Sequence, residues 1–436
     1  MGGPHPAPAP PPESAKMVLE ILLKLPTRDV IRCCCVCRLW RSVVANPTFR
    51  DLHAAEANHV SAAPPEALLV TVTLEPGRPD EASFFRVSFP SKPAAMPHRV
   101  TIPSGYSLSN VCNGLLCFAL VRDSPEAPAF ICNPITGETA MVPKAPPPMG
   151  FTGGTIYHVF ALGFSPSTKE HKLFRFTFSP FSSIHGKTID LGVCTLDGAA
   201  GGGGWRQCSF RSQCPLLHTF TPLLVQGKLY LVTTGKTGPG ELRNPDGLLE
   251  VDVATEACHT HRLPFEAYQY HSAWDPLVNA CEMGGRLCLA VDILSGTETT
   301  ARKIQFWVLM SSSPPNHHDL HWDLRYSFHV DGNYYFFQPR SVWFDDAEMT
   351  LCYRDYNVLF KHGTRGRSPE PSPDADCPQC DRQIKLPQMP SNCEWNIFGG
   401  YRPSLLSPLT LAPPSSCWDG EEERHKCEHA LLLTLE

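Results

Sequence analysis

The chain has 436 residues, of which 42% are apolar and 18% are charged, and its formal net charge is −6. The apolar share predicts a sizeable folded core and excludes a globally disordered chain. The acidic balance argues against a general affinity for nucleic acid or for an anionic membrane surface, because either would require a basic face. With 44 prolines and 31 glycines, the chain favours many turns over long helices.

The 19 cysteines are an odd number and show no spacing typical of a disulfide framework. The N-terminal stretch MGGPHPAPAPPPESAK has no apolar run like that of a signal peptide, and no segment approaches membrane-spanning length. We therefore expect free thiols in a reducing intracellular compartment, the cytoplasm, the nucleus or both.

Three short helices are predicted after this Pro-rich leader. In the first, Val18, Ile21, Leu22 and Leu25 fall at the spacing of one helical stripe, and Pro26 ends the helix. RDVIRCCC predicts a second helix, and VCRLWRSVVA predicts a third that ends at Asn46-Pro47. About forty residues bury too little surface to be stable alone, so these helices must pack on the downstream domain or on a partner.

Four cysteines, Cys33, Cys34, Cys35 and Cys37, lie within five residues of this unit. No second Cys-X-X-Cys or histidine pair is nearby to complete a tetrahedral metal site. We interpret the cluster as small buried apolar side chains and predict no metal there.

The stretch from Val18 to Phe49 resembles an F-box, in the form found in large plant families. The matching elements keep their spacing and are Ile21-Leu22, Leu25-Pro26, Val30, Arg32, Val36-Cys37, Arg38, Trp40-Arg41, Pro47 and Phe49. The resemblance implies that the helices bind the Skp-type adaptor of an SCF ubiquitin ligase, and through it cullin. The implied adaptor contacts are Val18, Ile21, Leu22, Leu25, Pro26, Val36 and Trp40.

PPESAK stands where that family usually has Leu-Pro followed by an acidic residue. This departure keeps open an alternative, in which the chain is a β-propeller interaction scaffold with a degenerate F-box and engages no ligase.

From about residue 67 the apolar pattern changes to a period of two, which predicts an antiparallel all-β domain. In FFRVSF, Phe85, Val87 and Phe89 alternate with polar residues, and KLFRFTF repeats the pattern around Arg175. Other strand candidates include GLLCFAL, GKLYLVTT, RLCLAVDI and MTLCYRDYNVLF.

Loose repeats group these strands. NPITGE, SPSTKE and DVATEA share one turn plan, and NGLLCFAL, QGKLYLVT and GGRLCLAV each place a strand after a turn glycine. Units of roughly 40–55 residues predict a β-propeller of about six blades, with a two-sheet sandwich as the alternative.

VCNGLLC, NPITGE, LGFSPSTKEHKL and IFGGYRPSLLSPLTL also resemble the F-box-associated domain that follows plant F-boxes. That resemblance implies a propeller-like domain that recognises the protein to be ubiquitinated. The favoured function is the substrate-recognition subunit of an SCF-type ligase, without catalysis of its own. A propeller enzyme such as a kelch-like oxidase is a third hypothesis, which would need metal ligands converging on one face.

Other candidate sites carry weaker patterns. His317, His318 and His321 lie in a Pro-rich segment, and Cys377 and Cys380 form an isolated Cys-X-X-Cys pair. AAGGGGW precedes a strand and so is no phosphate loop. The aromatic stretch DGNYYFFQPRSVWF fits either a target-contact surface or two core strands. We predict no catalytic residue, no cofactor and no metal.

The predicted domain boundaries follow from these patterns. We expect a disordered leader at 1–16, a helical unit at 17–53, a linker at 54–66, the β domain at 67–411 with a disordered insertion at 361–383, and a tail at 412–436.

Overall fold

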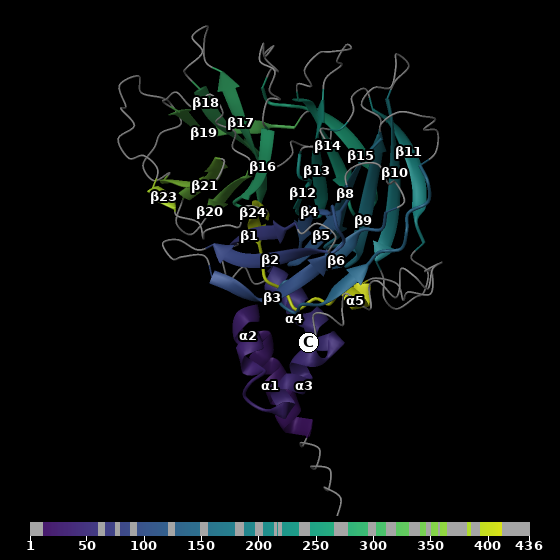
Figure 1. Ribbon diagram of the computed structural model, residues 1–436, viewed down its shortest axis with the longest axis vertical. Coiled ribbons are helices and arrows are strands. Elements are labelled where there is room, and N and C mark those ends of the chain that lie inside the picture. The colour runs from purple at the N-terminus through teal and green to yellow at the C-terminus, as the bar shows by residue number, and fades with distance from the viewer. Residues whose placement is uncertain are drawn as a thin grey trace, which may run out of the picture.

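The computed structural model has a small helical head below a larger body of β-sheets (Figure 1). It describes residues 12–59, 66–74, 79–87, 94–120, 127–148, 156–178, 187–196, 204–212, 216, 220–234, 245–265, 278–294, 302–310, 320–330, 341–345, 350–355, 358–363, 382–384 and 393–411.

The head contains four helices. They are α1 (Pro12–Leu23), α2 (Thr27–Cys33), α3 (Arg38–Ala45) and α4 (Pro47–His59). The extended backbone of Pro26, with ψ at 146°, separates α1 from α2, as its sequence position predicts. Asn46 caps α4, because its Oδ1 accepts the backbone N–H groups of Thr48 at 2.9 Å and Phe49 at 3.4 Å. Pro47 occupies the first helical position, where a missing N–H costs nothing.

The helices differ from the predicted ones in several places: α4 as a whole was not predicted, and α2 ends at Cys33, before the end of the predicted RDVIRCCC helix. Helix α1 already begins at Pro12, within the predicted leader, and α4 continues to His59, within the predicted linker. Helix α3 begins at Arg38, so Val36 lies in the turn before it and not on the helical stripe that the sequence suggested.

The body is a six-bladed β-propeller, which confirms the predicted fold and shows that the sandwich alternative was wrong. Each blade is a separate four-stranded antiparallel sheet. From the centre outward, blade 1 contains β24 (Cys393–Tyr401), β1 (Glu66–Thr73), β2 (Asp80–Val87) and β3 (Ala94–Ile102). Blade 2 contains β4 (Ser107–Cys112), β5 (Leu115–Ala119), β6 (Phe130–Cys132) and β7 (Thr139–Met141). Blade 3 contains β8 (Tyr157–Phe164), β9 (His171–Phe178), β10 (Lys187–Leu196) and β11 (Arg206–Ser212).

The remaining three blades follow in chain order. Blade 4 contains β12 (Leu223–Val225), β13 (Lys228–Thr234), β14 (Pro245–Asp252) and β15 (Cys258–Arg262). Blade 5 contains β16 (Val278–Met283), β17 (Arg286–Leu294), β18 (Arg302–Leu309) and β19 (Trp322–Val330). Blade 6 contains β20 (Ser341–Asp345), β21 (Thr350–Asp355), β22 (Val358–Gly363) and β23 (Arg382–Ile384), and a short helix α5 (Pro408–Leu411) follows β24. MTLCYRDYNVLF, predicted as one strand, thus forms β21 and the first half of β22.

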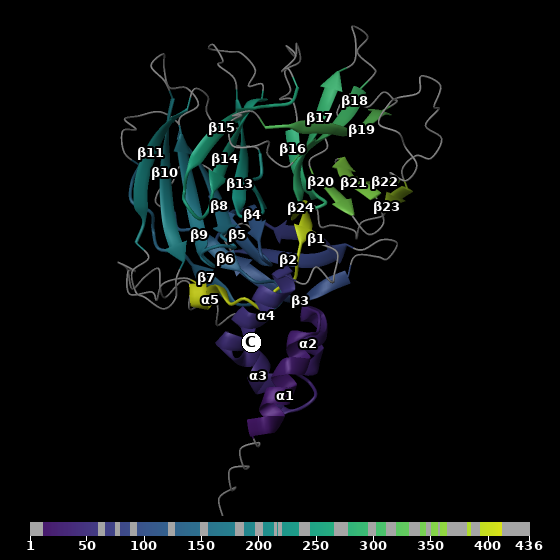
Figure 2. The same ribbon diagram turned by 180° about the vertical axis from the view of Figure 1, so that it is seen from behind.

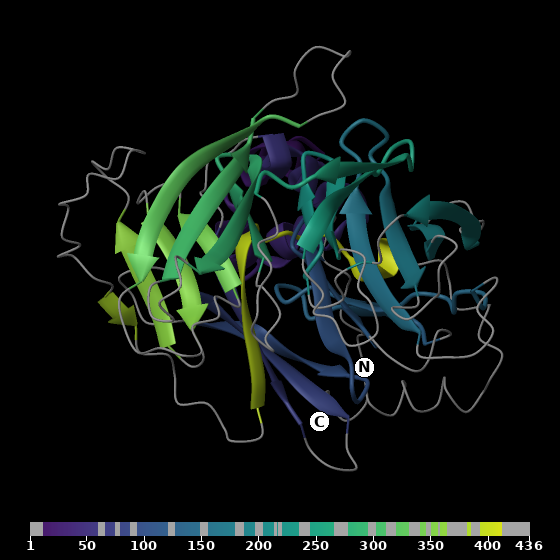
Figure 3. The same cartoon turned by 90° about the horizontal axis from the view of Figure 1, so that it is seen from above.

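The ring closes by pairing the last strand with the first. Strand β24 runs antiparallel to β1, with Leu69 opposite Ile397 and Val72 opposite Glu394. The six sheets surround a common centre in Figure 3, and yellow β24 lies beside the blue strands of blade 1. Because blade 1 takes its innermost strand from residues 393–401, the ring is complete only when both ends of the domain have folded.

The predicted turn repeats share one backbone geometry. In NPITGE, the Gly137 N–H donates to the Asn133 carbonyl at 2.9 Å. The Lys169 N–H donates to the Ser165 carbonyl at 2.8 Å in SPSTKE, and DVATEA has the equivalent bond at 2.8 Å. The fifth turn residue has a positive φ in all three copies, 72° at Gly137 and 62° at Lys169 and Glu256. The sequence repeat is therefore a structural repeat.

Three hairpins repeat in the same way. Their two-residue loops are Asn113-Gly114, Gln226-Gly227 and Gly284-Gly285, and both residues of each loop have a positive φ. This geometry suits the right-handed twist of the paired strands, and glycine at the second position adopts it without strain.

Strand β9 is buried along its whole length, because neighbouring blades cover both of its faces. Phe174, Phe176 and Phe178 enter a cluster with side chains of blade 4. Arg175 points to the opposite face, where it donates to the Pro146 carbonyl at 2.7 Å and lies over the Trp205 ring. The predicted alternation is present, but it separates two buried faces and not a buried face from a solvated one.

In blade 1 the apolar alternation is confirmed only in part. Val87 is buried, but Phe85, which the pattern grouped with Val87, is only partly covered, and Phe84 is buried instead. The pairing of β2 with β3 shifts register between Ser83 and Phe85, which changes the face that each following residue presents.

Several predicted segments lie outside the described residues. These are residues 1–11, His317, His318, Cys377, Cys380, 331–340 of the aromatic stretch, 364–381 of the insertion and the tail at 412–436.

Candidate functional site

The predicted adaptor contacts divide into an outer and an inner set. Ile21 and Val36 are 42% and 63% exposed, and Pro26 is exposed as well. Val18 and Leu22, at 5% and 0%, lie inside the head. The structure therefore brings Val18 and Leu22 into the core of the head, and places Ile21, Pro26 and Val36 on its surface.

Leu25 and Trp40 are half-buried against the core of the head. Met17, which is not among the predicted contacts, is 59% exposed. Met17 precedes Ile21 by four residues, so the two share one face of α1.

The Cys33–Cys37 region is only partly a packing cluster. Cys33 and Cys34 pack against the head core, and burial raises the pKa of the Cys34 thiol. Cys35 and Cys37 are exposed, which corrects the interpretation of all four as buried side chains. Because α2 ends at Cys33 and α3 begins at Arg38, the thiols do not share one helix face. Within the described ranges no group of three or more His, Cys, Asp or Glu residues is arranged to hold a metal.

Apolar contacts join the head to the propeller. Leu22, Val30 and Phe49 of the head form one buried cluster with Ile135 of the β6–β7 turn and Leu405 of the segment after β24. Figures 1 and 2 both show α4 between the propeller and the outer end of the head, where α1 and α3 lie.

Polar contacts reinforce this junction. Arg50 Nη1 contacts both carboxylate oxygens of Glu138, at 2.7 and 3.0 Å. Thr27 Oγ1 donates to the Pro403 carbonyl at 2.9 Å, and Arg28 pairs with Glu66 at the start of β1. The head is thus attached to the body through blades 1 and 2 and through the segment that follows β24.

We call residues 402–411 the strap. Asn133 Nδ2 donates to the strap carbonyls of Ser404 at 2.9 Å and Leu406 at 2.7 Å, and its Oδ1 accepts the Ile135 N–H at 2.8 Å. Leu405 faces the head, whereas Leu406 enters the cluster between blades 2 and 3. The strap is therefore held between the head and the propeller, where yellow coil runs to α5 in Figure 1.

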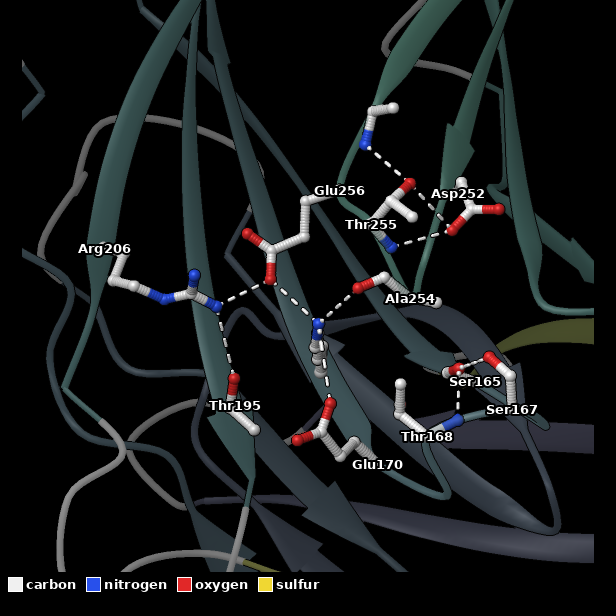
Figure 4. A network of polar contacts seen from close by, with 12 residues as sticks. Ser165, Ser167, Thr168, Glu170, Thr195, Arg206, Asp252, Ala254, Thr255 and Glu256 are labelled. Carbon is white, nitrogen blue, oxygen red and sulfur yellow. Dashed lines mark hydrogen bonds and ion pairs between the residues drawn. The ribbon is translucent and has the colours of Figure 1, made fainter.

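A second polar cluster joins blades 3 and 4 (Figure 4). Lys172 Nζ donates to Glu256 Oε1 at 2.9 Å and to the Ala254 carbonyl at 3.1 Å, and Arg206 donates to the same Glu256 oxygen at 2.6 Å. Burial by itself would raise the pKa of Glu256, but the bonds from Lys172 and Arg206 outweigh it and hold this pKa below its ordinary value. Every charge in the cluster has an opposite partner, so we interpret it as a contact that joins the blades.

No helix in the described part of the chain has both the length and the apolar character needed to cross a membrane.

Comparisons with known proteins agree on the two parts of the chain. Residues 14–52 match the F-box domain, and residues 69–318 match the F-box associated beta propeller domain. One F-box protein of Arabidopsis thaliana is 28% identical over 220 residues, which are 49% of this chain and 48% of that protein. F-box protein DOR of the same plant is 25% identical over 232 residues, which are 49% of this chain and 53% of that protein.

This chain spans about half the length of the curated relatives it matches. Among solved structures, the β-propeller domain of Cps50 (Swd1) from Myceliophteria thermophila is 10% identical and has a TM-score of 0.29. That alignment covers 63% of this chain and 84% of the Cps50 domain.

Proposed function

The chain belongs to the family of F-box proteins that carry an F-box associated β-propeller domain, and from this premise we propose that it is the substrate-recognition subunit of an SCF-type ubiquitin ligase. Its head binds the Skp-type adaptor, and through the adaptor a cullin. Its propeller binds the target protein. The complex acts in protein ubiquitination and degradation, in the cytoplasm, the nucleus or both.

The observation that carries this proposal is the apolar surface of the head. Met17, Ile21 and Val36 are exposed although the head already has a buried core and a large contact with the propeller. Exposed apolar side chains on a small helical unit favour a protein partner, because burying them against that partner releases water from apolar surface. We call these three residues the head surface.

In this role the protein contributes proximity and no chemistry of its own. A target held on the propeller is tethered near the ubiquitin-conjugating enzyme. Their encounter then becomes intramolecular and is governed by an effective concentration. The attachment of the head at Thr27, Arg28 and Arg50 supports this function, because it limits the positions that the target can take relative to the adaptor.

The head and the strap occupy the side of the propeller that contains the Asn133 turn. We therefore place target recognition on surfaces of the propeller away from this turn. A rigid β scaffold there would present loops of variable sequence to the target.

The test uses aspartate substitutions at exposed positions, which leave the head core intact. Ile21→Asp and Val36→Asp are expected to weaken binding of the purified adaptor at least about tenfold each, because a charge then has to be desolvated at the contact. Leu409→Asp is the matched control, since Leu409 is 61% exposed on α5 and lies outside the head. Titration calorimetry with the full chain measures the three affinities. Leu25 and Trp40 are poorer test positions because both pack inside the head.

The scaffold with a degenerate F-box is the second candidate, and the departure at PPESAK is the observation that favours it. It predicts no adaptor binding by the unsubstituted chain. Adaptor binding that Ile21→Asp and Val36→Asp leave unchanged would contradict the proposed contact surface, and absence of all binding would contradict the ligase function.

A further inference from the structure

The turn between α2 and α3 concentrates thiols beside the head surface. Cys35 and Cys37 are both exposed, and they are the two sequence neighbours of Val36, which is 63% exposed. Cys34 lies deeper, where its thiol donates to the Val30 carbonyl at 3.7 Å. The structure thus separates an inner cysteine that packs from an outer pair that faces solvent.

Most other described cysteines lie in the propeller and are inaccessible. Buried examples are Cys112, Cys117, Cys132, Cys194, Cys281 and Cys288. Cys208 is exposed, but it lies on β11 of blade 3. Since an oxidant in solution reaches exposed thiols first, the α2–α3 turn holds the accessible thiols of the described head.

Three arginines flank the two outer thiols along the chain. Arg32, Arg38 and Arg41 are exposed, and Arg41 Nε donates to the Cys34 carbonyl at 3.3 Å. The side chain of Arg32 is 80% exposed and contacts Asp29 at 3.2 Å. Three guanidinium groups against one carboxylate favour an anionic thiol reagent, and glutathione carries two carboxylates and one ammonium group.

We propose that Cys35 and Cys37 form a thiol-modification site whose ligand is glutathione, and that its occupation switches off adaptor binding. The inference rests on the proposed function, because the gated event is the adaptor contact. A Cys35 or Cys37 thiolate attacks one sulfur of glutathione disulfide. A new protein–glutathione disulfide bond forms, the original disulfide bond breaks, and reduced glutathione leaves after taking up a proton. The protein thiol is oxidised and the departing glutathione sulfur is reduced.

The effect on binding follows from the position of Val36. A glutathionyl group on either neighbour places a charged peptide against the apolar contact, so docking of the adaptor would have to displace it or bury its charges. Burying unpaired charges is costly, and we expect adaptor affinity to fall at least about tenfold. Reduction by excess thiol restores the contact.

The test uses the full chain, fully reduced or treated with glutathione disulfide, and measures adaptor affinity together with the modified positions. Trypsin cleaves after Arg32 and Arg38, so one short peptide contains all four head cysteines and its fragmentation locates the added groups. The variant C35S/C37S is expected to bind the adaptor like the reduced chain and to keep that affinity after treatment. C208S, the matched control with an exposed thiol removed from blade 3, is expected to stay sensitive.

Each outcome decides between the two ideas. Modification of Cys35 or Cys37 with a reversible loss of affinity supports the inference. If the folded chain stays unmodified at both positions, or is modified there and still binds, the inference is overturned and the proposed function stands. If the reduced chain itself does not bind the adaptor, the proposed function fails, and the gating role fails with it.

Discussion

Replacing Asn133 by alanine tests whether one buried amide holds the strap in place. The Asn133 side chain is fully buried and makes three hydrogen bonds, to the carbonyls of Ser404 and Leu406 and from the Ile135 N–H, at 2.7 to 2.9 Å. At about 1 kcal/mol for each bond the loss is about 3 kcal/mol, and it rises to about 5 kcal/mol where the freed backbone groups stay unpaired. We therefore expect Asn133→Ala to lower the free energy of unfolding by about 3 to 5 kcal/mol.

Two measurements check this expectation. Urea unfolding followed by tryptophan fluorescence gives the change in the free energy of unfolding, and hydrogen exchange read by mass spectrometry reports on the strap. We expect faster exchange at residues 404–406 and in the head helices, because Leu405 belongs to the cluster of the head. The hydrogen bonds of the Asn133 side chain reach the strap and its own turn, so blade 4 is expected to exchange as before.

Thr136→Ala is the matched control within the same turn. The Thr136 hydroxyl has only long contacts, at 3.4 Å to the Glu138 carboxylate and 3.3 Å from the Glu138 N–H, so its removal should cost less than about 0.5 kcal/mol. The reasoning is refuted if Asn133→Ala is as mild as Thr136→Ala, or if exchange in the strap is unchanged while stability falls.

Three further predictions concern a hairpin glycine, an ion pair between the head and the propeller, and a buried histidine. Gly114→Ala is expected to cost at least about 2 kcal/mol in free energy of unfolding, because φ is +80° and the new Cβ would lie 2.6 Å from the Ser404 Cβ. In the control Gly204→Ala the new Cβ meets no atom within 4 Å, so this change should be nearly neutral, and thermal unfolding compares the two variants. A double-mutant cycle at Arg50 and Glu138 should give a coupling energy of about 1 kcal/mol, and a value near zero would mean that this ion pair does not hold the head. Burial lowers the pKa of His171 to about 4, so its contribution to stability is fully present above the ordinary pKa of about 6.5 and is lost as the pH drops toward 4. His171→Phe should reduce the number of protons taken up on unfolding in this range by about one. If the slope of the free energy of unfolding against pH is unchanged in the variant, the assignment is contradicted.

In the helical head, the local sequence pattern predicts where some helices end and begin but not which side of a helix is buried. Pro26 ends a helix because its ring has no N–H, and Asn46 followed by Pro47 begins one because the Asn46 amide caps it. Both effects act within a few residues, so the sequence alone predicts them. The side of α1 that is buried depends on its contacts with α3, α4 and the propeller. The pattern therefore identified Val18, Ile21 and Leu22 as apolar helix positions but could not separate the buried two from the exposed one.

The cysteine cluster illustrates the same limit. Nothing in the order of Cys33, Cys34, Cys35 and Cys37 says where α2 ends, and a shift of the boundary by a few residues moves a thiol from the core to the surface. The exposure of Cys35 and Cys37 could be assigned only from the structure, which places both in the turn between α2 and α3.

The sequence by itself determined the turns of this protein, because their conformation is local. Asn-Gly and Gly-Gly pairs accept positive φ, and the NPITGE, SPSTKE and DVATEA turns close through bonds within five residues. Their recurrence was sufficient to predict the blades. Only the tertiary structure decided that β24 completes blade 1, that both faces of β9 are buried, and that the strap joins the head to the propeller. Each of these depends on contacts between residues far apart in the chain. Because the hydrophobic effect is non-directional, a local sequence pattern shows that a side chain is apolar but not which distant residues bury it.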